Sequence, residues 1–295
     1  MKNEQPLAEV FGFAANDFSK DAIRYRKLRL CPFNNRVPSC TKDKANNPLG
    51  VCSIFDKKSS DIVITCPIRF RENWLIAEDA ANYFFDKNDN WTSLSEIRLN
   101  DKFGETAGNI DMILVSYNSN GIITNFGALE VQAVYITGNI RRIFESYIDD
   151  PRKNIKLDWS KKVNYPKADF LSSSRKRLLP QLIYKGSILN KWQKRMAVAL
   201  NKPFYDTLPK LPEVSKNESE IAWLIYNVEI DKDDNKYKLR KDKTVYTKFS
   251  PALKQISTPK PGKVTEFINI LQEKLDEKLE SNPPVAPTII ESLEE

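Results

Sequence analysis

Two neighbouring segments within residues 108–135 have the apolar sequence of buried β-strands, but each also contains acidic or amide side chains. The segment IDMILV is interrupted only by Asp111, and the segment ALEVQAV contains Glu130 and Gln132 two positions apart. Side chains two positions apart share one face of a strand. The intervening residues NSNG, 118–121, are typical of a tight turn. The sequence therefore predicts a hairpin that brings Asp111 close to Glu130 and Gln132.

Ionised carboxylates inside such apolar strands cost several kcal/mol of free energy unless something compensates their charge. A divalent cation is a common compensation, so the pattern predicts a metal site. An alternative is a half-buried sheet in which Glu130 and Gln132 face water, opposite Leu129, Val131 and Ala133. The alternation of apolar and polar residues leaves both interpretations open.

A further strand is predicted at residues 91–99, directly before the hairpin. It contains Glu96, a third carboxylate that could reach the Asp111 strand. Asp101 and Glu105 are rivals for that place, because they lie in the loop between the two strands.

The 295 residues include no histidine. This absence excludes Ser-His-Asp and Cys-His hydrolysis, the His-Glu-His zinc proteases and nucleases with a histidine base. For hydrolysis, it leaves metal held by carboxylates, with lysine or water as the base. The central hairpin offers that chemistry.

The net charge of +7 is unevenly distributed along the chain. Residues 138–195 contain fifteen basic and five acidic side chains, a net charge of +10, with aromatic residues interspersed. A basic segment directly after a predicted metal site favours a bound polyanion, of which nucleic acid is the most common in the cytoplasm. The alternative is a solvated basic surface without a ligand.

All four cysteines, Cys31, Cys40, Cys52 and Cys66, lie within one window and are separated by eight, eleven and thirteen residues. These intervals are rich in Pro, Asn and Gly and poor in apolar residues, so core burial alone would not fix their shape. Three interpretations remain open: a tetrathiolate metal site, two disulfides, or unrelated buried thiols. For a tetrathiolate site the chemistry favours zinc, and iron is the alternative.

Residues 1–6 lack the features of a signal peptide, and no apolar run approaches the roughly 18 residues of a membrane span. We therefore expect a cytoplasmic protein without a membrane partner. A cytoplasmic address keeps thiols reduced, which argues against disulfides.

Periodicity predicts the remaining elements. We expect four parts: a helical lead-in with a tetracysteine metal-binding fold (1–71), a core (72–262), a C-terminal helix (263–281) and a disordered tail (282–295). Helices are expected at 1–30, 72–85, 140–148, 188–200 and 264–279, strands at 221–230 and 237–248, irregular structure at 150–180, and a turn at 231–235. The apolar stripe of the last helix is more typical of core packing than of a partner interface.

An acidic residue, then Asp111, then Glu130-Val131-Gln132 resembles the nuclease core written PD-(D/E)xK, with Gln132 at the position of the usual lysine. The sequences CPFNN, PLGVC and CPIRF, together with Cys40, make the match specific. They resemble the NotI family of type II restriction endonucleases over roughly residues 24–135.

The resemblance implies a mixed α/β fold: a PD-(D/E)xK restriction-endonuclease-like core sheet flanked by helices, with an N-terminal tetracysteine fold. It implies a homodimer that cuts both strands of double-stranded DNA at a GC-rich palindrome with Mg²⁺, in a system with a cognate DNA methyltransferase. One iron atom would occupy the site of Cys31, Cys40, Cys52 and Cys66, for which zinc remains the alternative.

Carried over residue by residue, Asp111 and Glu130 would hold Mg²⁺, Gln132 would orient the attacking water, and Glu96 would be the additional acidic residue. Candidate DNA contacts in the basic segment are Arg141, Arg142, Arg175, Lys176 and Arg177. Two other functions stay open: a non-catalytic DNA-binding regulator with a tetracysteine metal site, and a repair or junction nuclease of the same fold.

Overall fold

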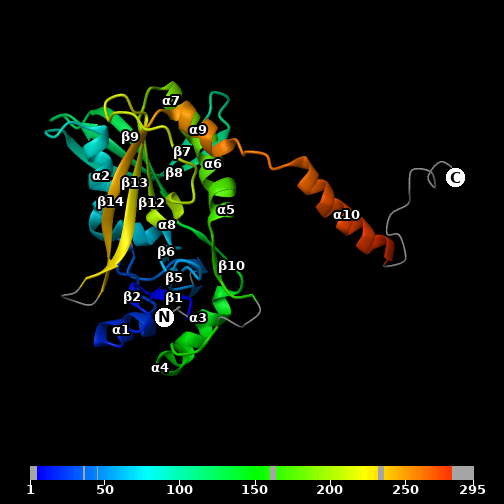
Figure 1. The fold of residues 1–295 in the computed structure, drawn as a ribbon. Helices are drawn as coiled ribbons and strands as arrows, with labels where there is room; N and C mark the ends of the chain where they lie inside the picture. The colour runs from blue at the N-terminus through cyan, green and yellow to red at the C-terminus, as the bar shows by residue number, and fades with distance from the viewer. Residues whose placement is uncertain (1–4, 36, 45, 160–163, 232–235, 281–295) are drawn as a thin grey trace. The chain divides into compact units, whose positions relative to one another are not determined.

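A computed structural model describes residues 5–35, 37–44, 46–159, 164–231 and 236–280 (Figure 1). The chain divides into two compact units, Met1–Ser257 and Thr258–Glu295. The predicted tail at 282–295, and most of the turn predicted at 231–235, lie outside the described residues.

A six-stranded mixed sheet forms the centre of the first unit, in the order β14-β13-β12-β9-β8-β7. Its strands are β7 (Asn90–Asn100), β8 (Thr106–Tyr117), β9 (Ile123–Gln132), β12 (Met196–Asn201), β13 (Ile221–Ile230) and β14 (Tyr237–Thr247). β7, β8 and β9 are antiparallel neighbours, β12 runs parallel to β9 and β13, and β14 is antiparallel to β13. Strands β7, β8 and β9 confirm the predicted strand at 91–99 and the predicted hairpin, and β13 and β14 confirm the strands predicted at 221–230 and 237–248. The central sheet and the helices that cover it confirm a mixed α/β fold.

The turn between β8 and β9 lies where the sequence predicts it. The Asn118 Oδ1 atom accepts hydrogen bonds from the backbone N–H groups of Asn120 and Ile122, both at 3.0 Å. Gly121 has φ +75°, a left-handed conformation that glycine adopts without a steric penalty. The two strands therefore leave the turn in a register fixed by local hydrogen bonds.

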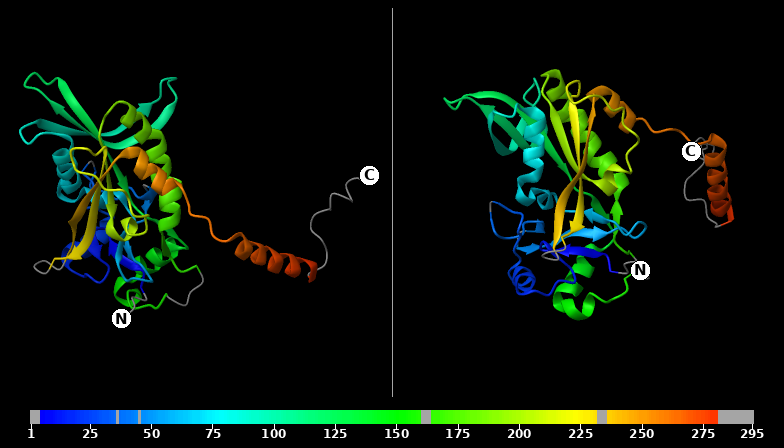
Figure 2. Two further views of the ribbon diagram at one scale, coloured as in Figure 1. Left: turned by 45° about the horizontal axis from the view of Figure 1, so that its top comes forward. Right: turned by 60° about the vertical axis from the view of Figure 1, so that its left-hand side comes forward.

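Helices cover both faces of the central sheet (Figure 2). Helix α2 (Leu75–Phe84) packs on one face, against Leu129, Ala199 and Leu224. The other face, with Ala128 and Val198, is covered by α9 (Phe249–Ser257) and by one continuous helical segment. That segment consists of α5 (Phe170–Ser173), η2 (Ser174–Leu178), α6 (Leu179–Gln181), η3 (Leu182–Gly186) and α7 (Ser187–Lys191), where η2 and η3 are π-helical turns.

A second, smaller sheet lies at one end of the unit, in the order β2-β1-β5-β6 (Figure 1). Its strands are β1 (Leu7–Val10), β2 (Phe13–Ala14), β5 (Val51–Phe55) and β6 (Ile62–Ile64). Around it and at its junction with the central sheet lie α1 (Lys20–Leu28), β3 (Asp43–Lys44), β4 (Asn47–Pro48), η1 (Pro67–Trp74), β10 (Tyr135–Thr137), α3 (Ile140–Asp149), α4 (Pro151–Asn154), β11 (Lys167–Asp169) and α8 (Lys202–Tyr205). Helices α2 and α3 confirm the predictions at 72–85 and 140–148.

Three predicted elements are wrong. Residues 1–30 are not one helical lead-in, because β1 and β2 precede α1; all four residues of β1 are buried, so it lacks the alternation that marks a one-sided strand. The helix predicted at 188–200 ends at Lys191, and Gln193, with φ +56°, turns the chain into the fully buried strand β12. The region 150–180, predicted to be irregular, contains α4, β11 and the start of the long helical segment.

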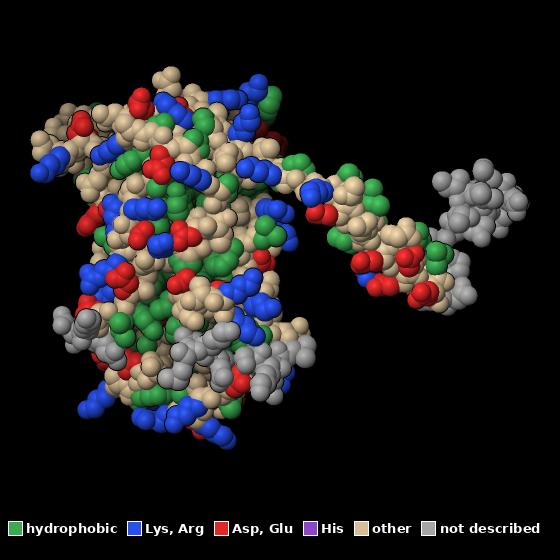
Figure 3. All heavy atoms as spheres, viewed as in Figure 1, with side chains coloured by type: hydrophobic (Ala, Val, Ile, Leu, Met, Phe, Trp, Pro, Cys, Tyr) green, Lys and Arg blue, Asp and Glu red, His purple; other side chains and the backbone are tan. Residues whose placement is uncertain are grey.

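The second unit contains α10 (Val264–Glu280), which confirms the predicted last helix. No residue of this helix is buried within its own unit, so its apolar stripe does not pack into a core there. Its apolar side chains form part of the visible surface in Figure 3.

Packing of α2 on the sheet depends on a glycine in β9. A Cβ atom at Gly127 would lie 2.5 Å from ring carbons of Phe84. We expect Gly127→Ala to lower the free energy of unfolding by about 1–3 kcal/mol through overpacking, measured by urea denaturation. Gly262→Ala is the control, because no atom lies within 4 Å of its added Cβ. Equal stability of the two variants would contradict this packing.

Candidate active site

The sheet register places three carboxylate residues in one row across β7, β8 and β9. The β8–β9 pairing ends at Met112 opposite Leu129, so Asp111 and Glu130 are the next residues in register. Asp111 is also tied to β9 by a hydrogen bond from the Val131 N–H to Asp111 Oδ2, with an N···O distance of 2.8 Å. The predicted hairpin thus brings Asp111 to Glu130.

Glu96 occupies the corresponding position on β7. Its neighbours Ser95 and Ile97 pair with Met112 and Ile110, which puts Glu96 across from Asp111. Glu96 is exposed and has φ +59°, a left-handed conformation that costs a non-glycine residue about 1–3 kcal/mol. The local distortion turns Glu96 out of the regular pleat at the row of carboxylates.

Glu130 is buried within the sheet, with only 1% of its surface exposed. Its Oε2 atom accepts a hydrogen bond from Lys185 Nζ at 2.6 Å, whereas its buried Oε1 atom has no hydrogen-bond partner among the described residues. Burial, followed by the negative charge of Asp111, raises the pKa of Glu130 to about 8, although Lys185 opposes the shift. Glu130 is therefore a carboxylate under strong pressure to gain a further positive partner.

Lys185 is the residue of this site that sequence analysis missed. It lies in η3, is 4% exposed, and donates a second hydrogen bond to the backbone carbonyl of Asn109 at 2.8 Å. It belongs to the basic segment 138–195, but it is 55 residues from Glu130 in the sequence. Only the path of the long helical segment over β9 brings the two together.

Gln132 is also buried, with 1% of its surface exposed, so the water-facing alternative for Glu130 and Gln132 is wrong. The Gln132 amide Nε2 donates a hydrogen bond to Gln181 Oε1. Gln181 and Lys185 are four residues apart, on one side of the helical segment, and contact Gln132 and Glu130 on one face of β9. The same helix side continues at Arg177, whose guanidinium lies over the Tyr135 ring at 4.0 Å and donates to its hydroxyl.

The donor set fits a divalent cation in part. Asp111 and Glu130 supply two adjacent carboxylates, and Glu130 Oε1 is a buried oxygen with no hydrogen bond in the described structure. In the described ranges, however, no group of three or more His, Cys, Asp and Glu side chains is arranged to hold a metal ion. Any metal here would need backbone, water or substrate oxygens to complete its coordination.

The four cysteines converge although they are far apart in sequence. Cys31, Cys40, Cys52 and Cys66 all line one small cavity of about 10 Å³, close to the volume a single water occupies, and none forms a disulfide. Burial, together with the nearby thiols, raises the pKa of Cys31 to about 11 and also raises the pKa of Cys40 and Cys52. The disulfide interpretation is not supported, and the metal site stays a prediction because no such ligand group is found in the part of the chain described.

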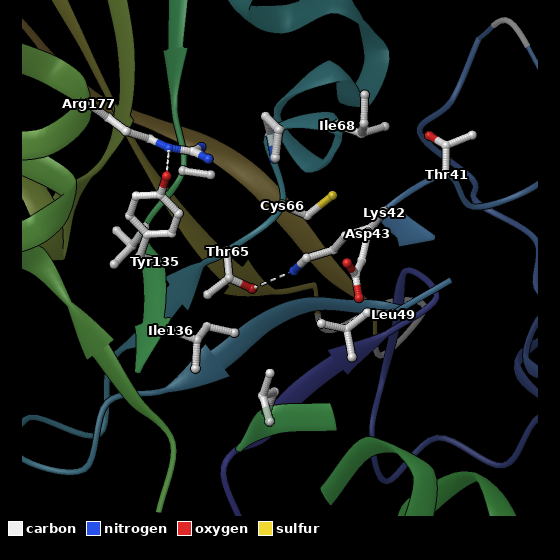
Figure 4. A pocket seen from close by; sticks show the side chains of 14 residues that line it. Thr41, Lys42, Asp43, Leu49, Thr65, Cys66, Ile68, Tyr135, Ile136 and Arg177 are labelled. Atoms are coloured by element: carbon white, nitrogen blue, oxygen red, sulfur yellow. Dashed lines mark hydrogen bonds between the residues drawn. The ribbon is translucent and has the colours of Figure 1, made fainter. Parts of the chain in front are cut away.

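A larger cavity of about 530 Å³ opens directly beyond the carboxyl end of β9 (Figure 4). Lys42 and Arg177 enter it from different elements: Lys42 Nζ contacts Thr65 Oγ1 at 3.2 Å, and Arg177 contacts Tyr135. The cavity is thus lined by two cations, and its wall includes residues that follow Gln132 directly in the chain.

The predicted DNA contacts do not form one cluster. Arg175, Lys176 and Arg177 are exposed on η2, while Arg142 is exposed on α3. Arg141 is engaged in ion pairs with Asp43 and Glu145. Arg177 contacts Tyr135, which follows β9 in the chain.

Comparison with known protein families decides the affiliation. The sequence profile of a family described as restriction endonuclease NotI matches residues 16–239. The chain belongs to the NotI restriction endonuclease family. The match confirms the resemblance, which covers the cysteines and the carboxylate row, and extends it to the part of the chain that contains Lys185. No curated protein matches the chain.

Membership in the NotI family makes the chain a DNA endonuclease that acts on double-stranded DNA. Restriction endonucleases usually use Mg²⁺. No helix in the described ranges is both long enough and apolar enough to cross a membrane.

The pairing of Glu130 with Lys185 can be tested without measuring activity. Removing Glu130 leaves the buried Lys185 without its partner, and removing Lys185 leaves a buried carboxyl group without its donor, so Glu130→Met and Lys185→Met should each lower the free energy of unfolding, by up to about 3–5 kcal/mol. The double variant should lose no more free energy of unfolding than one of the single variants. The effects are then not additive, and a double-mutant cycle followed by urea denaturation should give a coupling energy of about 2 kcal/mol or more.

The pair Lys202–Asp206 is the control for this cycle, because both side chains are more than one third exposed. Its coupling energy should stay below about 1 kcal/mol. Additive effects of the Glu130 and Lys185 variants would show that the two side chains are not paired in solution.

Proposed function

We propose that the chain is a type II restriction endonuclease that hydrolyses both strands of double-stranded DNA at a specific GC-rich palindrome in a Mg²⁺-dependent reaction. The observation that carries this proposal is the adjacent Asp111–Glu130 pair, with its unpartnered buried oxygen, inside the segment that matches the NotI family. The exposed basic side chains of η2 and the cations of the adjacent cavity are consistent with a bound phosphate backbone.

Asp111 and Glu130 would hold the metal ion, which supplies Lewis acidity and a lowered pKa of bound water. The row geometry puts Glu96 on the strand next to Asp111, so Glu96 would add a third carboxylate at the open side of the site. Gln132, held by Gln181, would present an amide to the attacking water. Asp111 is half-buried, so the site is reached from the β8 side of the sheet.

A palindromic DNA site has two-fold symmetry, and a homodimer with the same symmetry presents one active site to each strand. We therefore infer a homodimer as the cutting form. A cognate DNA methyltransferase would protect the host sites as a functional rather than a physical partner.

Digestion of a genome of known sequence tests the proposal directly. With Mg²⁺, the purified protein should give a reproducible ladder whose fragment ends share one GC-rich palindrome, and without Mg²⁺ it should give none. Binding without cutting would instead assign the chain to DNA-binding regulators. Cutting at branched structures without sequence preference would assign it to junction nucleases.

Single substitutions test the assigned carboxylates. Asp111→Ala should reduce cleavage to background while leaving specific DNA binding measurable by fluorescence anisotropy, because the loss falls on the chemical step. Glu96→Ala should impair cleavage about as severely if Glu96 completes the site. Glu229→Ala is the matched control, since Glu229 is exposed on β13, which carries none of the proposed site residues. Near-normal cleavage by Glu96→Ala would remove Glu96 from the site, and a fully active Asp111→Ala would overturn the assignment.

The tetracysteine site is proposed to bind one structural iron or zinc ion. The convergence of four free thiols on one cavity supports this proposal, because tetrathiolate sites take four cysteine ligands. Elemental analysis of purified protein should find about one such metal per chain, and Cys52→Ala should lose it together with thermal stability. Ser59→Ala, at an exposed turn between β5 and β6, should retain the metal. Protein free of iron and zinc would refute the proposal.

A further inference from the structure

The nuclease core motif leaves one charge unaccounted for in this chain. Its usual lysine stands two residues after the glutamate, and that position is occupied here by Gln132. An amide can donate and accept hydrogen bonds but carries no net charge. The positive charge that the motif supplies to the scissile phosphate must therefore come from elsewhere or be absent.

The structure places an ammonium group beside Glu130 from a different element. Lys185 Nζ lies 2.6 Å from Glu130 Oε2 and 2.8 Å from the carbonyl oxygen of Asn109. These two contacts use two of the three N–H donors of a lysine, and no further hydrogen bond of Nζ is found within the described residues. One donor is thus left for an oxygen of a bound substrate.

The ammonium group lies beneath the start of β8, next to residues that are partly open to solvent. Asn109, whose carbonyl it contacts, is exposed at the start of β8, and Asp111 two residues later is half-buried. The aliphatic part of Lys185 passes the backbone of Gly108. A Cβ atom added to this glycine would lie 3.9 Å from the Cδ atom of Lys185. The lysine is 4% exposed, and its ammonium group ends between Glu130 and the backbone of β8.

The helix geometry that delivers Lys185 is unusual. Two π-helical turns, η2 and η3, flank the short segment α6, and such turns are rare and frequently found at functional sites. Their spacing aligns Gln181 with Gln132 and Lys185 with Glu130, so one helix side contacts the same face of β9 twice in succession. A buried ion pair is at best weakly stabilising relative to packed apolar side chains, so stability alone gives little reason for this lysine.

We propose that Lys185 is the catalytic lysine of this endonuclease and supplies from the helical segment the charge that Gln132 cannot. This assignment rests on the proposed function. The Lys185 side chain donates a hydrogen bond to a non-bridging oxygen of the scissile phosphate. The oxygen of a water molecule forms a new bond to phosphorus while one phosphorus–oxygen bond to the sugar breaks. The leaving oxygen takes the bonding electron pair and a proton and becomes a hydroxyl group, and the proton lost by the attacking water passes to solvent.

An exchange of two side chains tests this proposal. Lys185→Gln should lower the single-turnover cleavage rate by about 100-fold or more, in line with the loss of one preorganised charge, while binding of a DNA fragment that the wild-type protein cuts changes less than about threefold. The exchange variant Gln132→Lys/Lys185→Gln keeps the composition and returns a lysine to the motif position. Its single-turnover cleavage rate should be at least about tenfold higher than that of Lys185→Gln.

Lys194→Gln is the matched control. Lys194 also lies close to β9, where its Nζ donates a hydrogen bond to Asn125 Oδ1 at 2.8 Å. Asn125 lies five residues before Glu130 on this strand, so Lys194 contacts a different part of β9. Its cleavage rate should stay within about threefold of wild type. Thermal unfolding of all variants shows which of them are folded.

Three results would overturn the proposal. These are a folded Lys185→Gln variant that cuts at nearly the wild-type rate, a folded exchange variant that recovers no activity, and failure of both variants to fold, which would make Lys185 a structural counter-ion of Glu130. If the wild-type protein cuts no DNA at all, the proposed function fails instead, and the two failures are thereby distinguished.

Discussion

The active-site region depends on the burial of one carboxylate. Glu130 lies near the carboxyl end of β9 with both faces of its sheet covered, where an unpaired charge would be strongly unfavourable. Lys185 supplies one partner, and the second carboxylate oxygen is left without a hydrogen bond among the described residues. Such an arrangement is only half compensated, so it is suited to a cation that arrives with the substrate.

The same constraint explains the course of the chain after β9. The long helical segment must lie over Glu130 and Gln132, because their polar groups need partners that a plain apolar helix would not provide. Two π-helical turns adjust the helix so that Gln181 and Lys185 meet these strand residues. The helix therefore closes the core with the same side chains that contact Glu130 and Gln132.

The cysteine region and the nuclease sheet are connected through a second buried charge. Arg69, which follows Cys66 closely, is fully buried, and its Nε atom lies 2.9 Å from Glu9 Oε1 in the small sheet. Its Nη2 atom donates to the carbonyl of Tyr237 at 3.0 Å, at the start of β14. Through this guanidinium the small sheet that carries Cys52 is tied to the edge of the central sheet.

The sequence by itself determined the hairpin with Asp111 and Glu130 and the family, because strand alternation, turn residues and short motifs are local signals. It misjudged β1 and β12, since strands buried on both faces lose the alternation that distinguishes them from helices. It also did not reveal the positive charge beside Glu130. Only the tertiary structure decided that point, because the contact joins residues 55 positions apart and depends on the packing of a helix across a sheet.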